Sequence, residues 1–231
     1  MRLNKLRSEF LNYLIAQDVE PGERLPTLAE MSEEIGISVG KLREQLEVAR
    51  SLGLVSVRPR VGVHRESFDF LPAVRSSALF ALATEEATFG HFNELRRAIE
   101  TCLWSPAVVC LTDEDMERLQ EIVARAWDKL EGEPVHIPSE EHRQLHLTIY
   151  GRLDNPFVRG ILEAYWDIYE ASELTRLASY QYWLDVWRYH ERIVDAICDG
   201  DFERGRKLLI EHFELLPTVS ASVSIDGERM V

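Results

Sequence analysis

The sequence predicts a mainly α protein, with an N-terminal winged helix-turn-helix of three helices and a small β-hairpin followed by an all-α bundle of six or seven helices. Apolar residues recur at helical spacing along almost the whole chain, and only one short stretch has two apolar runs joined by a basic turn. Charge is divided unevenly. Residues 1–66 hold ten basic and ten acidic residues, so the remainder carries the whole net charge of −14. The two parts therefore differ in kind.

Each of the first three helices is marked by apolar spacing or by end signals. The first, over roughly residues 2–16, has its inward positions at Leu3, Leu6, Phe10, Leu11 and Leu14. Thr27 and Glu30 form a capping box that starts a second helix running to about Ile35. Gly36 ends it as a left-handed residue, and Ser38 caps a third helix that reaches about Leu52. Two helices joined by a short turn predict a helix-turn-helix.

A small hairpin follows the third helix. The apolar runs Leu54–Val57 and Val61–His64 are separated by Arg58-Pro59-Arg60, which gives the hairpin the basic tip of a wing. Periodicity then breaks, and Pro72 marks a boundary. We therefore expect a first domain over 1–66 and a linker over 67–73.

Beyond the linker the chain reads as helices only. They are expected over roughly 74–84, 89–104, from a Thr112 cap through Leu130, from a Ser139 cap, from Pro156 to about Leu174, over 178–198 and over 202–215. The helix over 89–104 is expected to turn Leu95, Ala98, Ile99 and Cys102 inward. This second domain spans 74–216 and leaves 217–231 as a tail expected to be flexible.

The helix expected after Ser139 carries two histidines four residues apart. His142 and His146 therefore lie on one face, one turn apart. Two imidazoles so placed can share one metal ion if other segments supply further ligands, and His190 and His212 are available later in the chain. The alternative is that the pair are ordinary surface or half-buried histidines.

The first part resembles the winged-helix head of GntR-type bacterial transcription regulators. The resemblance rests on Pro21-Gly22-Glu23-Arg24-Leu25-Pro26, Ile35-Gly36-Ile37-Ser38, Lys41-Leu42-Arg43-Glu44 and Leu52-Gly53-Leu54-Val55. It implies binding to double-stranded operator DNA through the start of the recognition helix and through the wing. The DNA-contacting residues that it implies are Thr27, Ser38, Gly40, Lys41, Arg43, Arg58, Arg60, Gly62 and Arg65.

Two departures from that family affect the expected base contacts. The family commonly has Ser-Glu-Arg where this chain has Thr27-Leu28-Ala29, and Ser-Arg where it has Ser38-Val39. Two arginines expected at the DNA face are therefore absent, although arginine is the usual donor to guanine and to phosphate. Either the operator is unusual, or DNA binding is weak and depends on the wing.

The second part resembles the effector-binding (FCD) domain of the FadR subfamily of those regulators. Leu95-Arg96, Leu145-His146-Leu147, Leu153-Asp154-Asn155-Pro156, His190–Ile197 and His212 carry this resemblance. In metal-binding members an Asp and three His converge inside the bundle. The three histidines correspond to His146, His190 and His212, and the Asp corresponds to His142.

The chain thus offers four imidazoles where the family usually offers three and a carboxylate. Imidazole suits Zn, Ni, Cu and Fe, so zinc is expected, with nickel as an alternative. The exchange removes one negative charge and leaves the metal more electrophilic toward an anion. Three other arrangements remain open: three histidines plus water with His142 turned away, Glu141 as a ligand, and core histidines without metal.

Arg96 has two interpretations. An arginine on the inward side of a bundle helix needs a partner, because a lone buried charge is costly. It is either a clamp for an effector carboxylate, whose geometry the guanidinium fork matches, or the partner of Glu100 one turn later.

Composition limits the classes of protein that remain. No apolar run reaches membrane-spanning length, no secretion signal opens the chain, and three cysteines without paired spacing indicate a reduced, cytoplasmic protein. The resemblance implies a homodimeric transcription regulator, such as a repressor, that senses a small carboxylate at a metal and is not an enzyme. The alternatives are a metal-dependent hydrolase-like enzyme and an interaction protein with weakened DNA binding.

Overall fold

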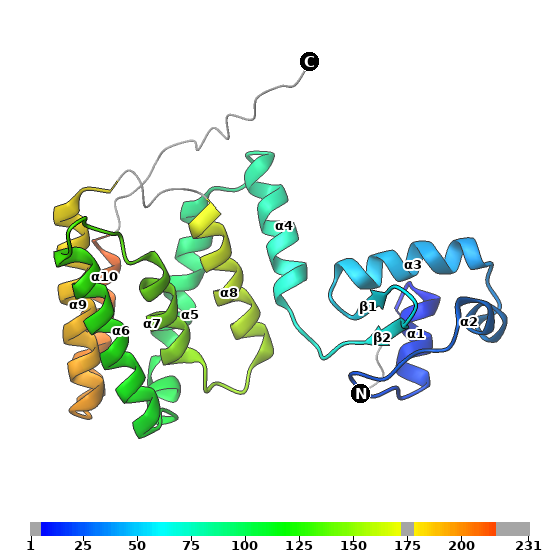
Figure 1. Ribbon diagram of the computed structural model, residues 1–231, viewed down its shortest axis with the longest axis horizontal. Coiled ribbons are helices and arrows are strands. Elements are labelled where there is room, and N and C mark those ends of the chain that lie inside the picture. Colours follow the sequence, from blue (N-terminus) through cyan, green and yellow to red (C-terminus); the bar gives the residue numbers. More distant parts are fainter. Residues whose placement is uncertain (1–5, 172–177, 216–231) are drawn as a thin grey trace, which may run out of the picture. The chain divides into compact units, whose positions relative to one another are not determined.

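The computed structural model describes residues 6–171 and 178–215. The chain divides into two compact units, Met1–Ala73 and Val74–Val231 (Figure 1). The described residues form ten helices and one two-stranded hairpin, so the mainly α class with an N-terminal winged helix-turn-helix is confirmed. Parts of three expectations lie outside the described residues: the start of the first helix, the end of the helix from Pro156, and the tail 217–231.

The first unit contains α1 (Glu9–Ala16), α2 (Leu28–Ile35) and α3 (Val39–Ser51). Helix α1 begins at Glu9, later than expected, because Ser8 adopts an extended conformation and accepts a hydrogen bond from Leu11 N. The caps of α2 and α3 are as predicted. Thr27 and Glu30 bond reciprocally, and Ser38 Oγ accepts from Lys41 N at 3.3 Å. Gly36 ends α2 with φ +78°.

The wing is an antiparallel pair, β1 (Val55–Arg58) and β2 (Gly62–Arg65). The segment before α2 runs along the other edge of β2, where Leu25 N donates to Val63 O at 2.8 Å. The core of the unit joins all three helices to the hairpin, and its most buried members are Phe10, Met31, Leu42, Ala49 and Val55. A helix-turn-helix and a wing are therefore held on one small core.

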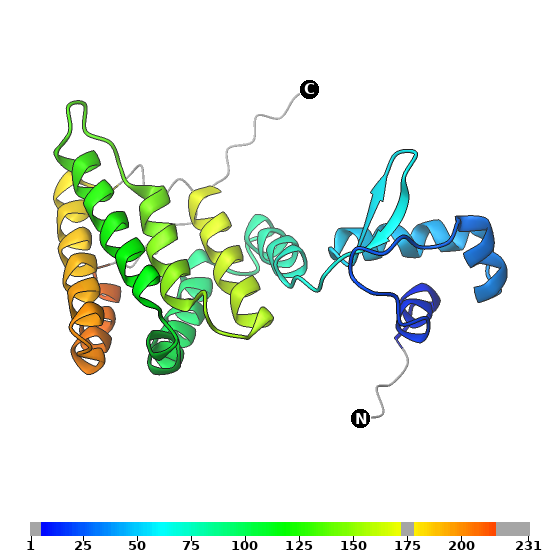
Figure 2. The same cartoon turned by 60° about the horizontal axis from the view of Figure 1, so that its bottom comes forward.

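The second unit contains the helices α5 to α10 and all of α4 from Val74 onward. Their bounds are α4 (Leu71–Ala83), α5 (Phe89–Val109), α6 (Asp113–Glu131), α7 (Ser139–Tyr150), α8 (Pro156–Ala171), α9 (Tyr180–Cys198) and α10 (Phe202–Phe213). Helix α9 packs against α6 and α10 (Figure 2). Helix α5 packs against α7, α8 and α10. The core between them is rich in tryptophan, with Trp104, Trp183 and Trp187 fully buried.

In the second unit, the starts of α4 and α7 differ from the prediction. Helix α4 begins at Leu71, inside the stretch 67–73 expected to be a linker, because Pro72 occupies the first turn, where its missing N–H costs nothing. Asp69 accepts from Leu71 N at 2.9 Å and so caps this start. Ser139 is the first residue of α7 and not its N-cap, and no side chain caps that helix.

Helix α5 differs most from the prediction. It continues through Pro106 to Val109, although the sequence indicated an end near residue 104. Three of the four residues predicted to face inward are exposed, namely Leu95, Ala98 and Cys102, whereas Ile99 is half-buried and packs against the core. The buried side chains of α5 are instead Arg96, Glu100, Trp104, Ala107 and Val108. Arg96 and Glu100 can lie on the core side of this helix because they form an ion pair with each other.

None of the described helices combines the length and apolar character needed to cross a bilayer.

Candidate metal centre

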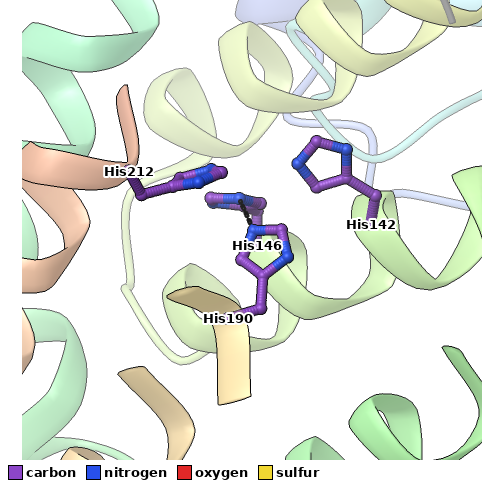
Figure 3. Close-up of side chains that lie close together, drawn as sticks. All are labelled: His142, His146, His190 and His212. Carbon is purple, nitrogen blue, oxygen red and sulfur yellow. Dashed lines mark hydrogen bonds between the residues drawn. The ribbon is translucent and has the colours of Figure 1, made fainter. Parts of the chain in front are cut away.

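Four buried histidines from three helices meet inside the second unit. His142 and His146 lie on α7, His190 on α9 and His212 on α10, and their rings converge (Figure 3). Each is at most 1% exposed. One ring nitrogen from each lies within 4.8 Å of the others, so the four side chains could hold one metal ion.

Local sequence explains why the helices present these residues together. The spacing of four places His142 and His146 one turn apart on the same face of α7. Gly200, with φ +72°, reverses the chain between α9 and α10, and Asp201 caps α10 by accepting from Arg204 N at 3.1 Å. Gly205 then lets α10 approach α5, because a Cβ there would lie 2.7 Å from Trp104 Cζ2. His212 thereby faces His190, with ring centroids 4.4 Å apart.

The ring nitrogens lack most of the hydrogen bonds that burial demands. Within the described part of the chain, both nitrogens of His142, both of His212 and Nδ1 of His190 have no partner. His146 Nε2 and His190 Nε2 lie 3.3 Å apart. Unpartnered buried polar atoms are costly and uncommon. A metal ion would give each imidazole a partner, so the donor set fits a transition metal.

The electrostatic environment keeps these rings neutral. Burial lowers the pKa of His142, His190 and His212 well below the usual histidine value, and the neighbouring imidazoles and Arg96 add to that shift. Burial also lowers the pKa of His146, although the carboxylate of Glu100 opposes the shift. Neutral imidazole is the form that binds metal, so the ligands need no deprotonation at neutral pH.

A buried ion pair lies directly beside His146. Arg96 Nε donates to Glu100 Oε1 at 2.8 Å, and the other carboxylate oxygen, Oε2, lies 2.9 Å from His146 Nδ1. Burial raises the pKa of Glu100, but the charge of Arg96 and the hydrogen bonds from Arg96 and His146 outweigh it and hold that pKa below its usual range. Arg96 is also held by the rings of Tyr165 and Trp166, whose centroids lie 4.6 and 4.7 Å from its Cζ.

The structure confirms the pairing of Arg96 with Glu100, one of the two interpretations of this arginine. The pair with Glu100 uses Nε, and Nη1 donates to the hydroxyl of Tyr165 at 3.1 Å. The remaining nitrogen, Nη2, lies 3.0 Å from His146 Nε2. If Nε2 binds a metal, it cannot also accept from Nη2, and Nη2 becomes a donor directed at the centre.

Glu141, the alternative ligand, forms an ion pair with Lys129. It is 4% exposed and accepts from Lys129 Nζ at 2.8 Å, and the group of potential ligand atoms found among the described residues does not include it.

Three buried indoles lie close to His142. The rings of Trp166, Trp183 and Trp187 have centroids 4.7, 6.0 and 6.4 Å from the ring of His142. Their Nε1 donors are buried, and none has an acceptor within residues 6–171 and 178–215. Their helical spacing in the sequence is typical of core residues or of a pocket wall. The missing acceptors become visible once the helices are assembled.

The predicted DNA-contacting residues lie at the start of α2, on the turn before α3, on α3 and on the wing of the first unit. Thr27 and Ser38 serve as caps, Lys41 pairs with Glu9, and Arg65 donates to Val19 O. The remaining five, Gly40, Arg43, Arg58, Arg60 and Gly62, lie on α3 or the wing, and the three arginines are exposed.

One arginine at the wing was not predicted from the sequence. Arg24 crosses Gly62, where a Cβ would lie 2.9 Å from Arg24 Nε, and its backbone bridges to His64. The wing of the first unit therefore carries one more basic side chain than the hairpin sequence indicates.

Comparisons with known proteins identify both parts of the chain. The family model "Bacterial regulatory proteins, gntR family" matches residues 5–64, and the model "FCD domain" matches residues 92–215. A similar curated protein is the HTH-type transcriptional repressor NanR of Enterobacter sp. (strain 638). It is 26% identical over an alignment 232 residues long, which covers 98% of this chain and 87% of NanR. Another is the HTH-type transcriptional regulator LutR of Bacillus subtilis, 21% identical over 205 residues, covering 84% of this chain and 90% of LutR.

A solved structure supports the fold. The structure "Streptococcus agalactiae GntR" aligns with a TM-score of 0.60 over 89% of this chain and 94% of that protein, at 16% identity.

Proposed function

The chain belongs to the GntR family of bacterial regulatory proteins as a DNA-binding transcription regulator with an FCD domain, and on that premise we propose that it senses a small organic acid at a metal ion held by His142, His146, His190 and His212. The observation that carries this proposal is the convergence of four buried, neutral imidazoles whose ring nitrogens largely lack other partners. The ion, zinc or nickel, would supply a Lewis-acidic position for an acid oxygen.

The protein's own residues orient and complete the centre. Glu100 accepts from His146 Nδ1–H, which leaves Nε2 for the metal, as carboxylates beside metal-bound histidines commonly do. Arg96 is fixed by Glu100 and Tyr165, and its Nη2 is the donor that would bind the acid's carboxylate. We propose that the regulator acts without catalysis, since both oxygens of Glu100 are engaged and neither is poised as a general base.

The domain assignments follow from the same premise. Residues 1–66 would bind operator DNA through Thr27, Ser38, Gly40, Lys41, Arg43, Arg58, Arg60, Gly62 and Arg65. Residues 74–216 would bind the effector and form a homodimer in the cytoplasm, so that two heads read an inverted repeat. Exposed apolar side chains on α4 and α5, with Phe80 65% and Val109 69% exposed, support a partner surface on this unit.

An operator gel shift tests the proposal. Fragments from upstream of the protein's own gene would be titrated with protein that is metal-loaded, chelator-treated or reloaded, each with and without a panel of small carboxylates. The expected result is that one acid changes operator affinity about 5- to 150-fold, and only in the metal-loaded protein. Equal responses with and without metal would contradict it.

A conservative variant separates the clamp from the ion pair. Arg96→Lys keeps the positive charge opposite Glu100 but loses the planar fork. Metal content should stay near one equivalent while the response to the acid weakens at least tenfold. A full response in Arg96→Lys would place the carboxylate contact elsewhere.

A further inference from the structure

The charge of the centre narrows the class of acid that it can bind. A divalent ion contributes two positive charges, and four neutral imidazoles contribute none. Among the described residues the other buried charged side chains are Arg96, Glu100 and Glu141. Arg96 and Glu100 cancel one another, and Glu141 is matched by Lys129. The loaded centre therefore keeps a net charge of two, in surroundings where an uncompensated charge is costly.

Hydrogen-bond donors without acceptors also surround the four imidazoles. Trp166, Trp183 and Trp187 are at most 1% exposed, and their indole N–H groups have no acceptor in the described part of the chain. Indole can only donate, and guanidinium can only donate. Arg96 Nη2 adds a further donor once His146 Nε2 binds the ion. The surroundings of the four imidazoles thus hold an excess of donors, which a ligand with several acceptor oxygens would satisfy.

From this balance of charge and donors we propose that the ligand is an oxygen-rich dianion, specifically a small dicarboxylate, and not a monocarboxylate. The inference rests on the proposed metal centre and goes further by fixing the ligand's charge. Two negative charges neutralise the loaded centre, whereas a monocarboxylate leaves one positive charge buried. A carboxylate at position 142 would have supplied one of those charges from the protein, so His142 sets the charge that the ligand must bring.

Matched ligand pairs test the proposal on the zinc-loaded full-length protein at pH 7.5. Malonate, succinate, glutarate and malate would each be compared with its own monoamide, which has nearly the same shape and one negative charge fewer. Binding would be measured by calorimetry, with inorganic phosphate and sulfate as dianions of another chemistry. At least one dicarboxylate should bind ten times or more tightly than its monoamide. Equal affinities within every pair, or binding of phosphate but of no dicarboxylate, would overturn the proposal.

The same protein provides a control that needs no substitution. After chelation the centre loses both charges of the ion and becomes neutral. The preference for the dicarboxylate should then fall below about threefold. A preference that survives full removal of zinc would show that the ion's charge is not its cause.

Two substitutions of similar size isolate the effect of position 142. His142→Asp adds one negative charge, so the loaded centre needs only a monoanion and the preference should fall below threefold. His142→Asn is the neutral control and should keep a preference of tenfold or more. Equal preferences in the two variants, at equal zinc content, would refute the charge argument. A wild-type protein that binds no zinc would instead refute the metal centre itself, so the two failures are distinguishable.

Discussion

Replacement of Arg96 by alanine is the most informative test of the buried network. Arg96 and Glu100 are 1% and 0% exposed, and the pair joins Nε to Oε1 at 2.8 Å. Arg96→Ala leaves the carboxylate of Glu100 buried without its guanidinium. Removal of one partner from a buried ion pair typically costs about 3–5 kcal/mol. The rings of Tyr165 and Trp166 also lose a cation contact, which contributes about 1 kcal/mol.

The double variant Arg96→Met/Glu100→Gln should be less destabilised than Arg96→Ala. Both charges are then absent, and replacement of a buried ion pair by well-packed apolar side chains is often close to neutral in free energy. Some cost remains, because His146 Nδ1 would face an amide that is a weaker acceptor than the carboxylate. We expect a cost of about 1–2 kcal/mol for the double variant.

Urea unfolding followed by tryptophan fluorescence measures these costs. The chain has five tryptophans, and all lie between Trp104 and Trp187, so fluorescence reports on the second unit alone. Chelator in every sample removes any contribution from metal binding. If Arg96→Ala unfolds within 1 kcal/mol of the wild type, the carboxylate is not held by Arg96 and the network described here is wrong.

Three further predictions concern the metal, the DNA and pH. His190→Ala should reduce bound zinc, measured by elemental analysis, from about one equivalent to a small fraction, and retention of zinc in this variant would argue against the site. Chelation should lower the melting temperature of the wild type, because only the native state holds the ion. Arg43→Ala should weaken operator binding by about 1–3 kcal/mol if Arg43 contacts a base. Arg60→Ala should weaken binding to all DNA sequences and reduce the slope of log affinity against log salt concentration by roughly one. Footprinting that finds no protected site at low salt would favour an interaction protein. Burial lowers the pKa of His142 and His190, so below about pH 6.5 the native apoprotein binds fewer protons than the unfolded chain. Its free energy of unfolding should therefore decrease as the pH is lowered, by up to about 1.4 kcal/mol per pH unit for each histidine. A urea midpoint that stays constant from pH 7.5 to 5.5 would contradict this.

Local signals in the sequence predicted much of the fold. The capping box of Thr27 and Glu30, the left-handed Gly36 and the cap at Ser38 depend on neighbouring residues only, and each forms as expected. The spacing of His142 and His146 likewise needed no more than helical geometry. Their meeting with His190 and His212 was inferred from the resemblance, because spacing alone cannot bring three helices together.

Long-range pairing is the part that the sequence could not provide. The i to i+4 relation of Arg96 and Glu100 was visible, but their contacts with His146 and Tyr165 join residues 50 and 69 positions away from Arg96. The apolar pattern also predicted the wrong core-facing residues on α5, where Leu95 is 45% exposed while Arg96 and Glu100 are buried. A pattern based on hydrophobicity assigns charged residues to solvent, and it fails where two charges satisfy each other.

The position of Arg96 on α5 suggests how the centre could influence the head. Along the chain, only the connections 66–70 and 84–88 and the helix α4 separate the wing from α5. Glu100 fixes one end of the guanidinium, so an anion that draws Nη2 toward the metal must move the side chain, the helix or both. Dense packing around Tyr165 and Trp166 resists side-chain motion alone, which favours displacement of α5. The size of the response is then limited by the difference in the anion's affinity between the two positions of α5, and not by its total affinity.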